Sequence, residues 1–456
     1  MALGSGVFHC ELAWLGGDMP SADVRLEIAD GVIRGVHPGA QRAADATVLT
    51  GLTLPGLANA HSHAFHRALR GRTQRGPGTF WTWRDDMYRL AAVLEPESYH
   101  RLARATFAEM VLAGIACVGE FHYVHHRPDG TPYEDPNAMS AALLDAAADA
   151  GIRMTLLDTC YLGAGLDGDG RLCEPSGAQV RFSDHSAARW VERVERMLGR
   201  AGVNARIGGA VHSVRAVDPN SLGVVAAWTA TRRLPLHAHV SEQPVENEQT
   251  LAALGCTPIA VLGQRGLLSD RFTAVHATHV DDADIELLAR TRAMVCMCPT
   301  TERDLADGIA PTRAFRDAGV AICLGSDSHA VIDPFEEARA VELDERLRSG
   351  ERGTHGAVAL LTAATETGYR SLGWPDGGRL VTGALADLTC VSLRSVRTAG
   401  TPPDGALEAA VFAAGAGDVT DVVIAGEHVV SGGRHRSIDV SAELDLAIAS
   451  VWEAVG

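Results

Sequence analysis

Short apolar runs alternate with longer amphipathic stretches through the middle of the chain. Each run is long enough for one buried strand, and the stretches between them repeat apolar residues at helical spacing, as in residues 97–114 and 186–200. Glycine or proline stands at many of the junctions. The expected strands are residues 52–57, 115–120, 153–158, 206–211, 234–240, 272–276, 293–298 and 320–326.

This alternation predicts the fold class. Strands that alternate with helices are typical of α/β proteins, and eight such units indicate a (β/α)8 TIM-like barrel. An open, doubly wound parallel sheet is the alternative. No P-loop pattern supports it.

The two ends of the chain have a different pattern. Residues 22–36 alternate polar and apolar positions around an Asp30-Gly31 pair, which predicts a hairpin. Residues 383–393 and 419–434 have the same character. We therefore expect a small composite β-sandwich domain formed by both chain ends. Its N-terminal part is residues 1–52, the barrel is residues 53–376, and residues 377–456 form its C-terminal part plus a terminal helix.

Composition and charge exclude several functions. Of the 456 residues, 46% are hydrophobic and 21% are charged, as in soluble globular proteins. The net charge of −17 argues against nucleic acid or an anionic membrane as a partner. All 40 basic residues are arginine, which excludes a Schiff-base lysine and a carboxylated lysine between two metals. No basic region precedes Arg25 and no uncharged apolar run is long enough for a membrane span, so a cytoplasmic location is expected.

Polar side chains follow several of the expected strands. His61 and His63 are two residues apart, so they share a face if the strand continues, and strand C-termini form the catalytic face of a barrel. Three imidazoles and a carboxylate suit Zn²⁺ or a similar first-row divalent ion. The histidines and acids near the ends of later strands are His237, His239, Glu242, His276, His279 and Asp327.

These residues carry a resemblance to a known superfamily. The HxH motif, "HAHVSE", "VHATH" and "LGSDS" resemble the metal-dependent amidohydrolases, and the split β domain resembles the composite sandwich of that superfamily. More narrowly, the sequence is similar to the formimidoylglutamate deiminases of histidine breakdown over nearly its whole length. The motifs that carry this similarity are "NAHSHAFHRAL", "TFWTWRDDMY", "HSVRAV", "HAHVSEQ", "VHATHV" and "CPTTERDLADG".

The resemblance implies one divalent metal ion, Zn²⁺ by ligand type, with Fe²⁺ or Mn²⁺ as alternatives. Its implied ligands are His61, His63, His239 and Asp327. His237 faces the same way as His239 in a strand and could compete with it. The family spacing of three residues before Glu242 favours His239, which leaves His237 as a buried, hydrogen-bonded histidine.

The implied reaction is hydrolysis of N-formimidoyl-L-glutamate to N-formyl-L-glutamate and ammonia. A zinc ion would lower the pKa of its bound water and supply hydroxide at neutral pH. Glu242 is expected to carry a proton from that water to the imino nitrogen. Asp327 would accept a second proton, and His276 would hydrogen-bond the hydroxide or the tetrahedral centre.

The implied substrate is a small dicarboxylate, and the resemblance also implies the residues that bind it. Arg84 and Arg215 are the expected partners of the carboxylates, because a guanidinium can bind a carboxylate through two parallel hydrogen bonds. Tyr123 and His212 join them. His66 stands where the family commonly has glutamine, so it is expected to bind the formimino group differently. The resemblance also implies a homodimer.

Three points stay open. The aromatic cluster in "FWTWR" either walls the pocket or packs in the core. The function could be that of another amidohydrolase-superfamily deaminase that acts on a purine, pyrimidine or triazine ring, which would need an aromatic slot in place of the arginines. A metal-free scaffold or interaction protein of the same fold typically loses ligands, whereas this chain keeps the four ligands, Glu242 and His276.

Overall fold

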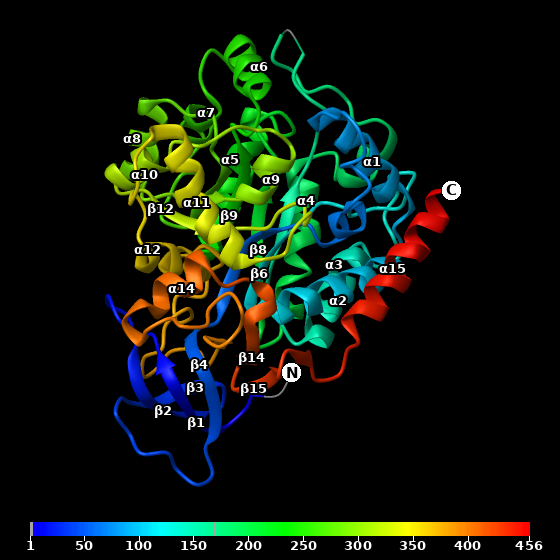
Figure 1. Ribbon diagram of the computed structural model, residues 1–456. Helices are drawn as coiled ribbons and strands as arrows, with labels where there is room; N and C mark the ends of the chain where they lie inside the picture. Colours follow the sequence, from blue (N-terminus) through cyan, green and yellow to red (C-terminus); the bar gives the residue numbers. More distant parts are fainter. Residues whose placement is uncertain (1–2, 168) are drawn as a thin grey trace.

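The computed structural model describes residues 3–167 and 169–456, and it contains two eight-stranded sheets (Figure 1). One of them is wholly parallel, with its strands in sequence order, which confirms the predicted barrel. Its strands are β5 (Leu57–Ser62), β6 (Ile115–His122), β7 (Arg153–Cys160), β8 (Ala205–Val211), β9 (Leu236–Val240), β10 (Phe272–His276), β11 (Met294–Met297) and β12 (Ala321–Leu324).

The first and last strands of this sheet meet and close the barrel. Ser62 and Asp327 form a parallel bridge. The backbone N–H groups of Ser326 and Asp327 both donate to the carbonyl of His61, at 3.1 and 3.0 Å, and the N–H of His63 donates to the carbonyl of Asp327 at 3.3 Å. The open-sheet alternative is therefore wrong.

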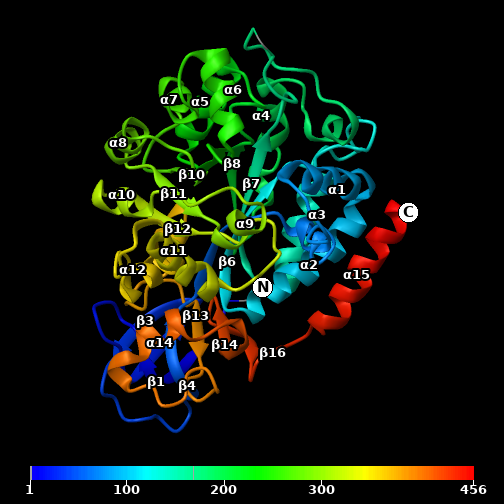
Figure 2. The same ribbon diagram turned by 45° about the horizontal axis from the view of Figure 1, so that its top comes forward.

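Helices surround the barrel (Figures 1 and 2). Among the described residues no helix is both long and apolar enough to cross a membrane. The helices are α1 (Phe80–Val93), α2 (Pro96–Leu112), α3 (Ala138–Ala150), α4 (Ala187–Glu195), α5 (Pro219–Arg232), α6 (Pro244–Leu254), α7 (Pro258–Gln264), α8 (Asp282–Thr291), α9 (Pro299–Asp304), α10 (Thr312–Asp317), α11 (Pro334–Ser349), α12 (Ala357–Thr362), α13 (Gly368–Ser371), α14 (Ala406–Phe412) and α15 (Val440–Val455).

The second sheet joins the two chain ends, as predicted. Its order is β16-β15-β14-β13-β4-β1-β2-β3, and the edge strand β3 also hydrogen-bonds to residues 383–386, ahead of β13. The sheet thus curls around its own apolar core. Its strands are β1 (Gly6–Ala13), β2 (Ser21–Ala29), β3 (Val32–His37), β4 (Thr47–Pro55), β13 (Leu388–Val391), β14 (Val419–Ile424), β15 (Glu427–Ser431) and β16 (Arg434–His435).

The Asp30-Gly31 hairpin lies where the sequence predicts it, between β2 and β3. Both residues have positive φ, 52° and 70°. A two-residue turn of this kind needs left-handed backbone at both positions, because its twist must match that of the flanking strands. Aspartate and glycine are among the residues that tolerate this conformation best.

The N-terminal edge of the barrel differs from the prediction. The apolar run 52–57 was expected to be the first barrel strand, but it forms the end of β4, and β5 begins at Leu57. The expected boundary between residues 52 and 53 therefore falls inside β4. Nearly every residue from 51 to 62 is buried, so no polar position marks where the chain passes from one sheet to the other at Pro55-Gly56.

The terminal helix leaves the small sheet and packs on the barrel. α15 runs along α2 and α1 (Figure 1). Glu443 of α15 pairs with Arg104 of α2, and the indole of Trp452 donates to the carbonyl of Ala68 at 2.8 Å. The C-terminus is thereby fixed beside the helices that support β5 and β6.

A buried carboxylate joins the two parts of the molecule. Asp387, just before β13, accepts two hydrogen bonds from Arg153 of β7, at 2.9 and 3.0 Å, and one from Tyr369 at 2.8 Å. It also accepts the backbone N–H of Ala425 at 2.7 Å. Both members of the ion pair are buried, so each depends on the other for its neutralisation.

We expect Asp387→Asn to lower the stability of the protein strongly. The substitution keeps the shape of the side chain but leaves the Arg153 charge buried without a partner, which typically costs about 3–5 kcal/mol. Urea denaturation followed by circular dichroism measures the change. Asp404→Asn, at an exposed position, is the control and should leave the midpoint unchanged. Equal midpoints for the two variants would contradict the role of Asp387.

Candidate metal centre and substrate pocket

Four side chains meet at the C-terminal end of the barrel strands. His61 and His63 come from β5 and its end, His239 from β9, and Asp327 follows β12. The Nε2 atom of His239 lies 3.1 Å from Nε2 of His61 and 3.4 Å from that of His63. Oδ1 of Asp327 lies 3.3 Å from Nε2 of both His61 and His63. The four predicted ligands therefore form one group that could hold a metal ion.

Backbone carbonyls of neighbouring strands orient two of these rings. Nδ1 of His63 is 2.8 Å from the carbonyl oxygen of Phe121 in β6, and Nδ1 of His239 is 3.0 Å from that of His212, after β8. A neutral imidazole that donates from Nδ1 keeps its lone pair on Nε2. Both lone pairs then face the centre of the group, as in metal-ligating histidines.

The charge state of the group fits a divalent cation. Burial lowers the pKa of His61, His63 and His239, to about 3 for His63, so these rings are neutral at pH 7. Burial alone would raise the pKa of Asp327, but the hydrogen bond from His61 and the positive charge of His276 hold that pKa well below its usual range. Three neutral imidazoles and an ionised carboxylate are a typical donor set for Zn²⁺ and related ions.

The backbone is strained where three of these strands end. Ser241, His276 and Asp327 have positive φ values of 51°, 71° and 39°. Non-glycine residues rarely adopt this left-handed conformation, and such residues cluster at functional sites. The strain turns the chain sharply after β9, β10 and β12, which lets the side chains at the strand ends point into the pocket.

Glu242 and His276 lie next to the four-residue group. Nε2 of His276 is 3.8 Å from Oε1 of Glu242 and 3.8 Å from Oδ2 of Asp327. Burial raises the pKa of Glu242 to about 7. Burial alone would lower the pKa of His276, but Glu242, Glu302 and Asp327 outweigh it and raise that pKa to about 10. Glu242 is thus suited to exchange a proton near neutral pH, whereas His276 stays protonated and can donate a hydrogen bond.

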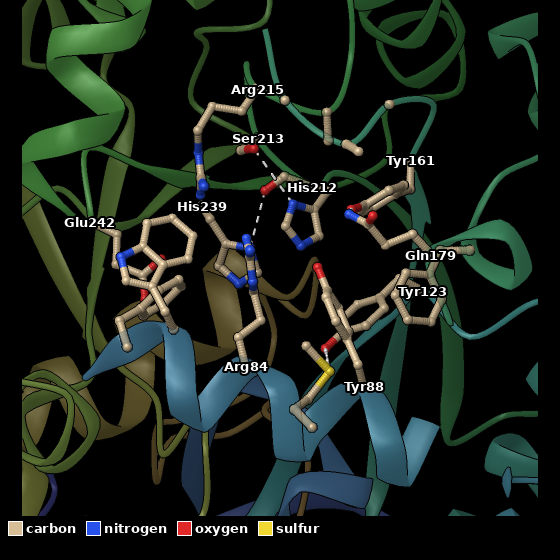
Figure 3. Close-up of a pocket in the computed structure, with 18 of the residues that line it drawn as sticks. Arg84, Tyr88, Tyr123, Tyr161, Gln179, His212, Ser213, Arg215, His239 and Glu242 are labelled. Atoms are coloured by element: carbon tan, nitrogen blue, oxygen red, sulfur yellow. Dashed lines mark hydrogen bonds between the residues drawn. The ribbon is translucent and has the colours of Figure 1, made fainter. Parts of the chain in front are cut away.

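A cavity of about 320 Å³ opens above these groups, and it contains all the predicted substrate residues. Arg84 on α1 and Arg215 after β8 enter it from opposite sides, with His239 between them (Figure 3). Within the described chain the Nε atoms of Arg84 and Arg215 are buried and have no hydrogen-bond partner. The Arg84 guanidinium stacks over Trp81 at 4.3 Å, and Arg215 lies 3.9 Å from Glu246.

Aromatic side chains form much of the wall. Phe80, Trp81 and Trp83 all line the cavity, so the "FWTWR" segment walls the pocket. The Nε2 atom of His66 is 3.0 Å from the Tyr123 hydroxyl, at the base of the cavity. The predicted substrate residues His66, Arg84, Tyr123, His212 and Arg215 are therefore brought together, and their roles in binding stay predictions.

His237 does not belong to the four-residue group. Its ring is buried one layer below His239, where Nε2 is 2.9 Å from the carbonyl oxygen of Ser371. Another potential metal group, His122, His125 and Asp158, is also buried. There the Asp158 carboxylate already pairs with Arg193 at 2.8 Å, and that positive charge would repel a cation.

Several supporting residues were not predicted from the sequence. Glu302 approaches Nδ1 of His276 at 3.3 Å and also accepts the N–H of Cys298 at 2.9 Å. The Gln179 amide donates to the Tyr161 hydroxyl at 2.7 Å on the pocket wall. Glu302 lies in the "CPTTE" motif. That motif contributed to the family resemblance, but it did not predict a role for this side chain. Nothing in the local pattern distinguishes Tyr161 or Gln179.

The chain is similar to known proteins over most of its length. A family model described as the amidohydrolase family matches residues 52–429. A solved amidohydrolase from Brucella melitensis superposes with a TM-score of 0.90 at 32% identity, covering 98% of this chain and all of the other. An adenosine deaminase from Xanthomonas campestris with bound zinc superposes with a TM-score of 0.83 at 25% identity, covering 98% of both chains.

The chain belongs to the amidohydrolase family. Within that family it is a homologue of the formimidoylglutamate deiminase of Pseudomonas aeruginosa. The two sequences are 38% identical over 433 residues, an alignment that covers 92% of this chain and 94% of the relative.

We expect His63→Ala to abolish metal binding, because it removes one of four donors from a closed group. After reconstitution with Zn²⁺ and desalting, elemental analysis should find about one ion per wild-type chain and less than about a tenth of that in the variant, since a four-ligand zinc site depends on every ligand. His237→Asn is the matched control on the neighbouring layer. Metal loss in the control alone would assign the ligand role to His237.

Proposed function

We propose that this protein is a metal-dependent deiminase that hydrolyses N-formimidoyl-L-glutamate to N-formyl-L-glutamate and ammonia. One observation carries the choice of substrate. Two half-buried arginines, Arg84 and Arg215, line the same cavity as the metal donor group, and within the described chain their buried Nε atoms have no hydrogen-bond partner. A small substrate with two carboxylates matches this pair of cations. The relationship to a formimidoylglutamate deiminase supports the same substrate.

The residues at the base of the pocket are suited to hydrolyse an amidine. A divalent ion held by His61, His63, His239 and Asp327 would supply a Lewis acid that lowers the pKa of water. Glu242 takes one proton from the attacking water and passes it to the imino nitrogen. Asp327 takes the second proton from the hydroxyl of the tetrahedral centre and transfers it to the departing nitrogen, which leaves as ammonia. His276 donates a hydrogen bond to the developing tetrahedral centre.

The finer parts of the proposal concern the metal and the setting. Zn²⁺ is the proposed native ion because three imidazoles and one carboxylate suit it, and Fe²⁺ or Mn²⁺ would fit the same ligands. The substrate places the enzyme in histidine degradation. A homodimer, implied by the resemblance to the deiminase family, and a cytoplasmic location, expected from the sequence, complete the proposal.

A deaminase that acts on a heteroaromatic ring is the other candidate. The aromatic residues Phe80, Trp81 and Trp83 on the cavity wall favour it, because they offer faces for stacking. However, a neutral purine has no group that would neutralise Arg84 and Arg215. The charge of the pocket therefore favours the dicarboxylate.

The test is ammonia release from N-formimidoyl-L-glutamate by the zinc-loaded protein, with N-formyl-L-glutamate identified by mass spectrometry. We expect release that stops on chelation and returns with metal. Adenosine and guanine are the comparison substrates. Turnover of either purine without turnover of the dicarboxylate would overturn the proposal and direct attention to His66, which stands where the family commonly has glutamine.

Glu242→Gln separates chemistry from metal binding. The amide cannot accept a proton, so we expect kcat to fall by about 100- to 10,000-fold, the usual contribution of a general acid–base group. Metal content should stay at the wild-type level, because Glu242 is not among the four donors. Wild-type turnover by this variant would show that Glu242 does not carry the proton.

Arg84→Gln and Arg215→Gln test carboxylate recognition. Each removes one charged hydrogen-bond donor pair, so we expect KM to rise by about 10- to 100-fold, corresponding to ~1.5–3 kcal/mol per charged contact. Arg89→Gln is the control, since Arg89 lies on the same helix but is exposed and pairs with Asp86. Steady-state kinetics at constant ionic strength give KM. An unchanged KM in both pocket variants would exclude these arginines as carboxylate partners.

A further inference from the structure

Five arginines surround a hollow at the end of the barrel opposite the proposed active site. The hollow has a volume of about 660 Å³ and is lined by Arg206, Arg233, Arg271, Arg292 and Arg370, with Asp270 as the one carboxylate among its described lining residues. Such a concentration of positive charge is unexpected in a chain with a net charge of −17. Its volume lies within the range of small-molecule binding sites.

Four of the five arginines come from consecutive units of the barrel. Arg206 is the second residue of β8, Arg271 directly precedes β10, and Arg233 and Arg292 end helices α5 and α8 just before β9 and β11. β8, β9, β10 and β11 are neighbours in the sheet, and Figure 2 shows β8, β10 and β11 following one another across the barrel. The N-terminal ends of these strands therefore bring the four arginines into one place, and Arg370 joins them from α13.

The charges of the hollow are mostly not neutralised. Asp270 pairs with Arg271 at 3.2 Å, and Arg206 stacks on Trp374 at 4.0 Å and donates to the carbonyl of Gly373. Within the described parts of the chain, the guanidinium groups of Arg233, Arg292 and Arg370 have no ion-pair or hydrogen-bond partner. Three free guanidinium groups thus face one solvent-filled hollow.

Helix ends explain only part of this arrangement. Arg233 and Arg292 cap α5 and α8 with left-handed backbone, at φ values of 55° and 60°, and a positive charge is favourable at a helix C-terminus. That interaction accounts for one cation at each junction. It does not account for the scarcity of carboxylates around the shared hollow, because like charges that gather without counter-charges repel one another.

We propose that the hollow binds a small molecule that carries two or more phosphate groups. Guanidinium groups bind phosphate oxygens in pairs of parallel hydrogen bonds, and each phosphate group brings between one and two negative charges at neutral pH. A chain of phosphates can therefore neutralise several arginines at once. The net charge of −17 disfavours a long nucleic acid.

The experiment is calorimetric titration of the zinc-loaded, full-length protein with inorganic tripolyphosphate at low ionic strength. We expect saturable binding at one site per chain. The combined variant Arg233→Gln, Arg292→Gln and Arg370→Gln should bind at least about tenfold more weakly, since each charged hydrogen bond it removes contributes to affinity. All three side chains are exposed, so the variant should fold normally.

A second combined variant provides the matched control. Arg42→Gln, Arg265→Gln and Arg352→Gln remove the same charge from exposed positions outside the hollow. Tripolyphosphate also chelates zinc, but it does so equally in both variants, so only their difference is informative. Equal affinities would show that the protein binds phosphate through its general surface charge and would overturn the proposal. Absence of binding by the wild-type protein would do the same.

Competing ligands define the chemical class. We expect a nucleoside triphosphate to displace tripolyphosphate, because it has the same phosphate chain, and we expect citrate to displace it only at much higher concentration. Citrate that binds as tightly would overturn the assignment to phosphates. A short single-stranded oligonucleotide that binds more tightly would overturn the assignment to a small molecule.

Discussion

The rest of the structure depends on the closure of the barrel between β5 and β12. Two backbone N–H groups of the β12 end donate to the single carbonyl of His61, and His63 donates back to Asp327. These bonds bring the imidazoles of His61 and His63 next to the carboxylate of Asp327, which lies more than 260 residues further along the chain. In an open sheet, β5 and β12 would be opposite edges, and the four donors could not meet. The donor group can therefore form only when the barrel is closed.

The same hydrogen-bonding groups serve the sheet and the site. The carbonyl groups that orient His63 and His239 belong to the neighbouring strand β6 and to the residue after β8. A shift of either strand by one residue would move these carbonyls and release the rings. Left-handed residues at the ends of β9, β10 and β12 then direct the chain into the pocket. The accuracy of the site thus comes from strand register, which the barrel fixes before any ligand is present.

The sequence predicts most of this arrangement, and the failures have physical causes. The run 272–276 matches β10 residue for residue, because this short, mainly apolar run begins after Arg271 and ends at the polar residue His276. The run at 52–57 was placed in the barrel because buried residues continue without a break from β4 into β5. The sequence predicted His61 and His63 from their two-residue spacing, and Asp327 from its place after an apolar run. Glu302 and Tyr161 were missed because their positions depend on how helices and loops pack above the barrel, and no short-range pattern records this.

Electrostatics at two scales govern what such a protein can bind. A net charge of −17 repels a dicarboxylate at long range, but salt at physiological concentration screens that repulsion beyond about 8 Å. Salt screens charges less inside the half-enclosed pocket. The nearby charges of Arg84 and Arg215 therefore contribute more to the electrostatic potential there than the net charge of the chain does. Glu246 lies 3.9 Å from Arg215 and offsets part of its charge. The same reasoning applies at the opposite end of the barrel, where Arg233, Arg292 and Arg370 have guanidinium groups without a partner among the described residues. Local geometry, which decides whether a cation has a partner, therefore determines anion binding more than total charge does.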